Sequence, residues 1–221
     1  MYRALEEAMS RRNEAAIFIS DRQRESILKG IFSSYYAPHT QKEVIFDTNR
    51  IWCTKLPALS RLFPQSRVIC CVRSVGWIVD SIERLVRSNP FELSGLFGFD
   101  ASNTVYTRVN IMAKSTGLVG YALDALREAY FGSDSNRLML LEYEDLCRDP
   151  EASIAKLYQF IGEPLFQHDF DNVEYEADDF DMQLGAKGLH NIRRKVEWVE
   201  RETILPPDLF RRFANDMFWR K

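Results

Sequence analysis

The sequence lacks long apolar runs, blocks of like charge and clustered metal ligands. Its apolar runs are only a few residues long, whereas a membrane-spanning helix needs about 20 residues, so we expect no membrane span. Four cysteines and three histidines are scattered without C-x-x-C or Cys/His spacing, so we predict neither a disulfide framework nor a metal site. The formal net charge of −3, with no long block of one sign, gives no indication of nucleic-acid binding.

A glycine-rich phosphate loop is also missing from these 221 residues. Ten glycines and eight prolines are spread along the chain and mark no low-complexity linker. A hydrophobic content of 46% is enough for one sizeable core, so we expect residues 1–221 to form a single domain. The chain begins with a charged amphipathic pattern, which predicts a helix and not a signal peptide. Unpaired thiols then favour a cytoplasmic location.

What is present is an alternation of short apolar strands and amphipathic helices. Strands are expected at residues 44–46, 68–72 and 138–143, and helices at 1–14, 21–35, about 56–63, 77–87, about 105–130, 150–161 and after 206. The sequence Asp149-Pro150-Glu151 is typical of a helix start. Alternation over residues 40–162 predicts an α/β fold with a parallel sheet flanked by helices.

The first candidate site lies where the apolar strand 68–72 turns into a helix. Arg73 follows the strand and Ser81 lies eight residues later, about one turn into the helix. Ligands of parallel α/β sheets bind at this corner, and an arginine fork with a hydroxyl group suits a phosphate. The alternative is structural: Arg73 pairs with an acid, and Ser81 bonds to a carbonyl one turn earlier.

Two further segments could carry chemistry. Tyr143 leaves a buried strand at its carboxyl end, where its ring could stack on a base or belong to the core. The basic segment from Lys187 to Lys195 follows an acidic stretch and could close over an anionic ligand or form a solvated surface. The segments 91–131 and 169–181 are expected to line a substrate pocket.

Together these stretches resemble the sulfotransferase superfamily that uses 3′-phosphoadenosine 5′-phosphosulfate. Residues 61–81 (RLFPQSRVICCVRS…DS) are similar to its strand–loop–helix for the 3′-phosphate. Residues 142–150 (EYEDLCRDP), continuing to 160–164 (FIGEP), are similar to its later strand and helix. The resemblance covers roughly residues 41–164 and, more weakly, 185–195, and it implies a P-loop NTPase-like sulfotransferase fold.

The resemblance implies roles for five residues at a nucleotide site. Arg73 and Ser81 would hold the 3′-phosphate of the co-substrate, and Tyr143 would contact its adenine. Lys187 and Gly188 would approach the 3′-phosphate from the C-terminal segment. The implied reaction transfers a sulfonyl group in line to a hydroxyl or amine of a small-molecule or carbohydrate acceptor, without a metal. The acceptor itself and the oligomeric state are not predicted.

The acceptor side offers other residues after the expected strand 44–46. Asp47 could accept the proton of the acceptor, and Arg50 could supply positive charge to the leaving group; alternatively the two satisfy a turn and pair with each other. His39 is the second candidate for the base.

One element of the family pattern has no counterpart in the sequence. The family's Pro-Lys-Ser/Ala-Gly-Thr-Thr loop, which cradles the 5′-phosphosulfate, does not occur among residues 1–221. We expect an N-terminally truncated form of a longer enzyme. The alternatives are an inactive nucleotide-binding or scaffold domain of the same fold, and a P-loop kinase-like phosphotransferase that would require Mg²⁺.

Overall fold

The computed structural model describes residues 2–10, 12–39, 41–175 and 178–220. The chain divides into two compact units, Met1–Ser66 and Arg67–Lys221, which we call the first and the second unit.

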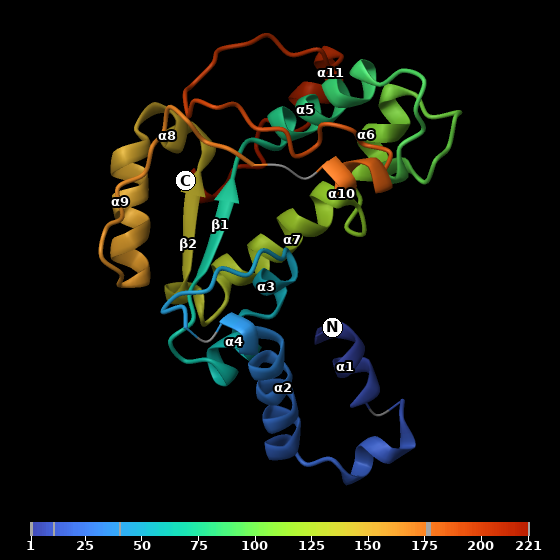
Figure 1. Ribbon diagram of the computed structural model, residues 1–221. Coiled ribbons are helices and arrows are strands. Elements are labelled where there is room, and N and C mark those ends of the chain that lie inside the picture. Colours follow the sequence, from blue (N-terminus) through green and yellow to red (C-terminus); the bar gives the residue numbers. More distant parts are fainter. Residues whose placement is uncertain (1, 11, 40, 176–177, 221) are drawn as a thin grey trace. The chain divides into compact units, whose positions relative to one another are not determined.

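The first unit is helical in its described residues (Figure 1). Its elements are α1 (Tyr2–Ala8), the 3₁₀ turns η1 (Glu14–Phe18) and η2 (Ala37–His39), α2 (Asp21–Tyr36), α3 (Ile51–Thr54) and α4 (Leu56–Leu62). A capping box starts α2: Ser20 accepts a hydrogen bond from the Gln23 amide, and the Gln23 side chain accepts one from the Ser20 amide. The expected helix at 21–35 is therefore confirmed.

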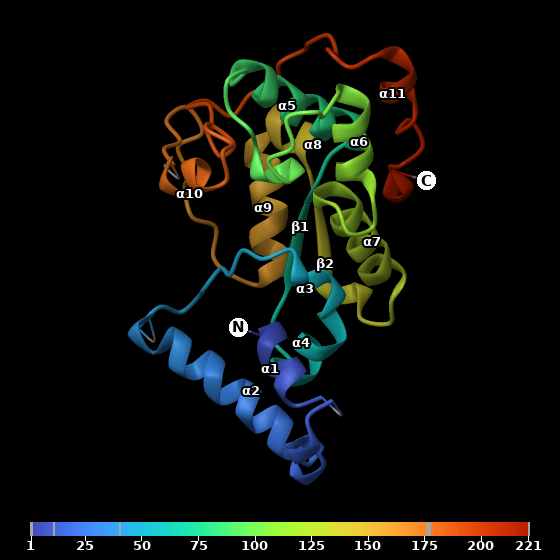
Figure 2. The same ribbon diagram turned by 90° about the vertical axis from the view of Figure 1, so that its right-hand side faces the viewer.

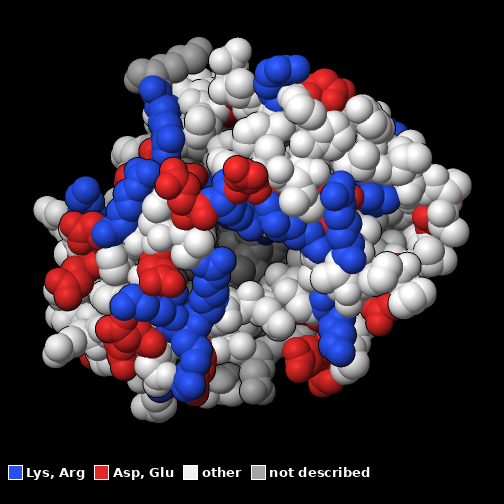
Figure 3. Space-filling model, turned by 90° about the horizontal axis from the view of Figure 1, so that it is seen from above, with Lys and Arg blue, Asp and Glu red and all other residues white. Residues whose placement is uncertain are grey.

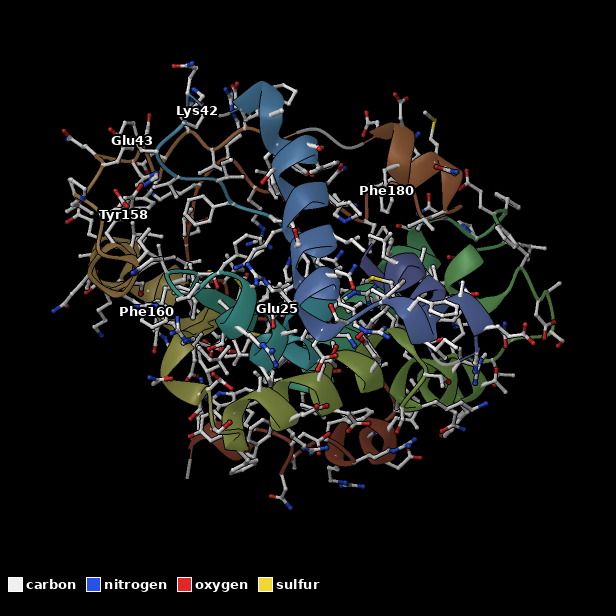
Figure 4. All side chains as sticks on the ribbon, turned by 90° about the horizontal axis from the view of Figure 1, so that it is seen from below. Glu25, Lys42, Glu43, Tyr158, Phe160 and Phe180 are labelled. Atoms are coloured by element: carbon white, nitrogen blue, oxygen red, sulfur yellow. The ribbon has the colours of Figure 1, made fainter. Side chains whose placement is uncertain are left out.

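A small apolar cluster holds the first unit together. Met9, Leu28 and Leu62 are buried against one another, so the start of the chain, α2 and α4 share one core. Two ion pairs lie around this core: Lys55 Nζ is 2.7 Å from Glu6 Oε1, and Arg61 pairs with Glu25 of α2 (Figure 4). The short helices are thus stabilised mainly by packing, because isolated helices of this length are marginal in water.

Two predictions for the first unit are wrong. Residues Val44–Phe46 form no strand, and the three side chains are 38%, 42% and 65% exposed. A strand needs a hydrogen-bonded neighbour, and the described part of this unit contains none. The expected helix 1–14 ends at Ala8, because Ser10 bonds back to the Glu7 carbonyl and Asn13 caps η1 instead. Residues 1 and 11 of that prediction lie outside the described residues.

The second unit is built on two parallel strands, β1 (Val68–Val72) and β2 (Leu138–Glu142) (Figure 1). Their register pairs Val68 with Leu138 and Val72 with Glu142. The other elements are α5 (Val75–Ser88), η3 (Gly95–Phe97), α6 (Val105–Ala113), α7 (Leu118–Phe131), η4 (Ser135–Arg137), α8 (Tyr143–Arg148), α9 (Pro150–Ile161), α10 (Asp178–Gln183), α11 (Pro207–Arg211) and η5 (Phe218–Arg220).

Helices lie on both sides of the two strands (Figures 1 and 2). Leu126 of α7 and Phe218 of η5 pack against Val72 on one side, and α9 runs along β2 on the other. A larger core joins α5, α6 and α7 to the C-terminal segment through Val79, Val109, Leu205 and other buried residues. The predicted parallel sheet flanked by helices is confirmed in this coarse form.

The expected long helix at 105–130 consists of two helices, α6 and α7, separated at residues 114–117. At Gly117 the backbone passes so close to the carbonyl oxygens of Ile111 and Met112 that any side chain would overlap them. Glycine therefore allows a sharp turn within a continuous helical pattern.

The helix at 150–161 is confirmed as α9, and Asp149 accepts a hydrogen bond from the Ala152 amide at 3.0 Å. Gly162, with φ +80°, ends this helix in the left-handed conformation. The expected helix near Pro206 is confirmed as α11.

Candidate functional site

Arg73 and Tyr143 meet where the two strands end. Val72 and Glu142 are register partners, so the residues that follow them leave the sheet at the same edge. The guanidinium carbon of Arg73 lies 4.0 Å from the centroid of the Tyr143 ring. Arg73 Nε is buried without a hydrogen-bond partner, and within the described residues Arg73 forms no ion pair with a carboxylate. The structural alternative for Arg73, pairing with an acid, therefore finds no support in this part of the chain.

Ser81 lies in the second turn of α5 beside an arginine that the sequence did not single out. Arg201 Nη2 donates a hydrogen bond to Ser81 Oγ at 2.7 Å and lies 3.2 Å from Asp80 Oδ2. Ser81 Oγ itself donates to the Trp77 carbonyl at 2.9 Å, which is the structural contact that the sequence left open. The hydroxyl group is thus held by its own helix while its lone pairs face Arg201.

The guanidinium groups give this site a positive potential. Burial lowers the pKa of Arg201, the Asp80 carboxylate raises it, and the positive charges of Arg73 and Arg84 lower it again. Arginine charges gathered in this way favour the binding of an anion, although Asp80 offsets part of the charge. Figure 3 views the molecule from the side toward which both strands point, and Lys and Arg side chains gather there.

Asp80 ties the C-terminal segment to α5. It is fully buried and accepts hydrogen bonds from Arg84 Nε at 2.8 Å, Thr203 Oγ1 at 2.9 Å and the Ile204 amide at 2.7 Å. Burial raises the pKa of Asp80, but these hydrogen bonds and the Arg84 charge lower it more, so the net shift is downward. The carboxylate thereby fixes the position of Arg201 beside Ser81.

An aromatic side chain from the same C-terminal segment lies next to Tyr143. The Trp198 ring is centred 6.3 Å from that of Tyr143, and Arg148 lies over the Trp198 ring at 4.8 Å. Burial and a hydrogen bond with Cys147 raise the pKa of Tyr143, while the charges of Arg73 and Arg193 lower it; the net shift is upward. The phenol is therefore neutral at physiological pH and presents an aromatic surface between cations.

Lys187 and Gly188 belong to the C-terminal part of the chain and pack beside the last turns of α5. The Lys187 carbonyl accepts a hydrogen bond from Asn89 Nδ2 at 3.2 Å, and its side chain is exposed. Gly188 has φ +84°, a conformation that favours glycine, and a Cβ there would lie 3.6 Å from Leu85 Cδ1. These contacts place the two residues at the later turns of α5, whereas Arg73, Ser81 and Tyr143 gather at its beginning.

Asp47 and Arg50 belong to the first unit. One Asp47 oxygen accepts a hydrogen bond from the Tyr36 hydroxyl, and the other accepts one from Trp52 Nε1 at 2.8 Å. Burial, and then the hydrogen bond and negative charge of Asp47, raise the pKa of Tyr36. Tyr36, Asp47 and Trp52 line a cavity of about 320 Å³ in the first unit. His39 ends the 3₁₀ turn η2.

Sequence reasoning missed Arg201 and Trp198. The basic segment was recognised only as far as Lys195, and both residues lie beyond it. Arg201 is 120 residues from Ser81, so no local pattern joins them. The available signal was the mixture of arginines with a tryptophan just after the basic run, a composition suited to a stacked, charged site.

No helix in the described part of the chain is long and apolar enough to cross a membrane. No three His, Cys, Asp or Glu side chains among the described residues are grouped as metal ligands.

Comparison with known proteins adds a decisive observation. The family model described as "Sulfotransferase family" matches residues 2–168, which is most of the chain. The chain belongs to the sulfotransferase family. Neither the curated proteins nor the solved structures contain a match. Membership of the sulfotransferase family indicates a transferase that acts on sulfonyl groups, and it favours this class over a kinase-like phosphotransferase.

Proposed function

We propose that this protein transfers a sulfonyl group from 3′-phosphoadenosine 5′-phosphosulfate to a hydroxyl or amine of a small-molecule or carbohydrate acceptor. The observation that carries the proposal is the cluster at the strand ends. The Arg73 guanidinium group lies over the Tyr143 ring, its Nε is buried without a hydrogen-bond partner, and Ser81 accepts a hydrogen bond from Arg201. This donor set fits a nucleotide with a separate phosphate group, because it offers cations for the phosphate and aromatic rings for the base.

The chain's own residues would act as follows. Arg73 and Arg201 would donate charge-assisted hydrogen bonds to the 3′-phosphate, and Ser81 would add its hydroxyl. Tyr143 and Trp198 would provide the stacking surface for adenine. Lys187 and Gly188 would hold the C-terminal segment against the later turns of α5. Transfer forms a bond between sulfur and the acceptor oxygen or nitrogen and breaks the bond between sulfur and the phosphate oxygen, which leaves adenosine 3′,5′-bisphosphate.

Asp47 and Arg50 remain the sequence's candidates for acceptor chemistry. Both oxygens of Asp47 already accept hydrogen bonds within the first unit. An Asp47→Asn variant tests this role, because it keeps the size of the side chain and removes its capacity to take a proton.

Calorimetric titration with adenosine 3′,5′-bisphosphate tests the proposed nucleotide site. Arg73→Ala and Arg201→Ala should each weaken binding by at least tenfold, since a hydrogen bond to a charged group contributes about 1.5–3 kcal/mol. Arg211→Ala is the matched control, because Arg211 is an exposed arginine in the last turn of α11. Equal affinity for all four proteins, or no binding by the folded wild type, would contradict the assignment.

A further inference from the structure

The second unit also contains a carboxylate–imidazole pair that has no part in the proposed nucleotide site. Asp181 of α10 is 1% exposed, and its Oδ1 lies 2.5 Å from His190 Nδ1. Its other oxygen accepts the backbone amide of His190 at 2.9 Å. A buried carboxylate thus fixes both the position and the ring orientation of one imidazole.

The arrangement leaves one side of the imidazole available. The His190 side chain is 39% exposed, and only Nδ1 of its ring makes a hydrogen bond within the described residues. Phe180 of α10 contacts the ring edge-on, with the centroids 5.4 Å apart (Figure 4). When the carboxylate holds Nδ1–H, the lone pair of the neutral imidazole is on Nε2, where it can accept a proton.

The segment that carries the pair leads from the later turns of α5 to the proposed nucleotide site. Gly188 packs near Leu85, which is one turn along α5 from Ser81, a rise of about 6 Å. His190 is two residues beyond Gly188, and two extended residues span at most about 7 Å. Three residues farther on, Arg193 is close enough to influence the pKa of Tyr143. The imidazole is therefore carried by the stretch of chain that runs from the later turns of α5 to the adenine-stacking ring.

Two exposed phenylalanines, Phe180 and Phe99, come from α10 and from the loop that packs against the residues after α10. Phe180 and Phe99 are 54% and 55% exposed. The Phe99 ring lies near Gly95 and Gly185, and the Gly95 amide donates to the Leu184 carbonyl at 2.8 Å. Phe99 also has φ +57°, a strained conformation for a residue other than glycine. Loop 91–104 thus packs against the residues that follow α10, and Phe180 of α10 contacts the His190 ring.

We propose that Asp181 and His190 form the proton-accepting pair for an acceptor hydroxyl carried on an aromatic or aliphatic body. The inference rests on the proposed sulfonyl transfer. His190 Nε2 takes the hydroxyl proton as the oxygen–sulfur bond forms, while the bond from sulfur to the phosphate oxygen breaks and that oxygen keeps the electron pair. Asp181 is the positioning residue: it holds Nδ1–H and stabilises the imidazolium that results. Phe99 and Phe180 contact the apolar body of the acceptor.

Chemical modification tests the open nitrogen without any knowledge of the acceptor. Diethyl pyrocarbonate is applied to the full chain, and modification at each histidine is followed by mass spectrometry of peptides. His190 should react at least as fast as the exposed His168, and Asp181→Asn should slow its reaction several-fold. If His190 stays unmodified in the wild type, its Nε2 is not accessible to the reagent, and this result would overturn the proposal.

Turnover separates this inference from the proposed function. The labelled donor is mixed with 2-naphthol, and nucleotide affinity is measured on the same samples. His190→Gln should lower transfer by about 10²- to 10⁴-fold and change the dissociation constant for adenosine 3′,5′-bisphosphate by less than twofold. His168→Gln, a variant of an exposed histidine that contacts Tyr158, should change neither.

Each remaining outcome contradicts either the assignment of the base or the proposed function. Full transfer by His190→Gln, or transfer lost in Asp47→Asn instead, would overturn the assignment of the base. Loss of nucleotide affinity in His190→Gln would make it a binding residue and would also overturn it. A wild type that binds no nucleotide would contradict the proposed function, whatever the reactivity of His190.

Discussion

At the scale of single residues, Asp80 is the group on which the site's geometry depends most. Its carboxylate is fully buried and contacts two arginines and the 203–204 segment. Asp80→Asn keeps the shape but leaves Arg84 and Arg201 without their counter-charge. We expect the free energy of unfolding, measured with urea, to fall by about 3–5 kcal/mol. Asp124→Asn is the control, because that carboxylate is 50% exposed and its pair with Arg127 contributes less than about 1 kcal/mol.

The same carboxylate makes stability depend on pH. The pKa of Asp80 is lowered in the folded protein from the usual value of about 3.9. A lowered pKa means that the charged form stabilises the fold fully above about pH 4, and that this contribution is lost as the pH falls through the folded pKa. The difference in unfolding free energy between wild type and Asp80→Asn should therefore be constant from pH 7 to about 5 and shrink below about pH 4. A difference that does not change down to pH 2 would contradict this account.

Tyr143 allows the stacking role to be separated from the hydroxyl. Its ring lies against Arg73, and its hydroxyl bonds with Cys147. Tyr143→Phe should leave the affinity for adenosine 3′,5′-bisphosphate within a few-fold of wild type, whereas Tyr143→Ala should weaken it by about 10- to 100-fold, because stacking of one base contributes about 1–3 kcal/mol. Tyr158→Ala on α9 is the control (Figure 4). If Phe and Ala variants bind equally well, adenine does not stack on this ring.

At the scale of elements, the sequence predicted those whose ends are marked by local chemistry. Proline at the first position and Asp149 at the cap predicted α9, and strand 68–72 was recognisable as an apolar run with a polar end. The prediction at 44–46 was wrong because a strand depends on a partner elsewhere in the chain. The break between α6 and α7 was missed because a helical apolar pattern continues through Gly117, and only the close backbone contact shows that the chain turns there.

The same distinction holds for the candidate site. Arg73, Ser81 and Tyr143 could be proposed because each stands at the end of a strand or the start of a helix. Arg201 and the Asp181–His190 pair could not, because their significance lies in contacts between segments far apart in sequence or within an irregular loop.

Two glycines in helical contexts should respond to alanine in opposite ways. Gly162 has φ +80° at the end of α9, and a Cβ there would meet no atom within 4 Å. Gly162→Ala should therefore lower the unfolding free energy by about 1–2 kcal/mol through backbone strain alone. Gly30 lies within α2, also with open space around it, so Gly30→Ala should raise helix stability by about 0.5–1 kcal/mol. Thermal unfolding followed by circular dichroism measures both. A shift of the same sign in both variants would show that backbone conformation does not decide the effect.

At the scale of the whole molecule, the proposed nucleotide site is built by one unit. Arg73, Ser81, Tyr143, Trp198 and Arg201 all belong to the second unit, and the residues that fix them, such as Asp80, do so as well. Binding of adenosine 3′,5′-bisphosphate should therefore slow amide exchange in the second unit. The affected segments should be the start of α5, α8 and residues 187–204. Because every residue of this set belongs to the second unit, we expect residues 1–66 to exchange at an unchanged rate.

Hydrogen exchange with and without adenosine 3′,5′-bisphosphate measures this difference directly. At a nucleotide concentration of 100 times the dissociation constant, binding should stabilise the second unit by about 2.7 kcal/mol, which reduces exchange through global opening of that unit about 100-fold. The Arg73→Ala variant at the same concentration serves as the control; with an affinity at least tenfold weaker, its protection should fall from about 100-fold to about 10-fold or less. Protection of residues 1–66 alone would place the nucleotide in the first unit and contradict the assignment. Protection confined to the second unit and at least tenfold smaller in the variant would support a nucleotide site formed by the ends of β1 and β2 and the C-terminal segment.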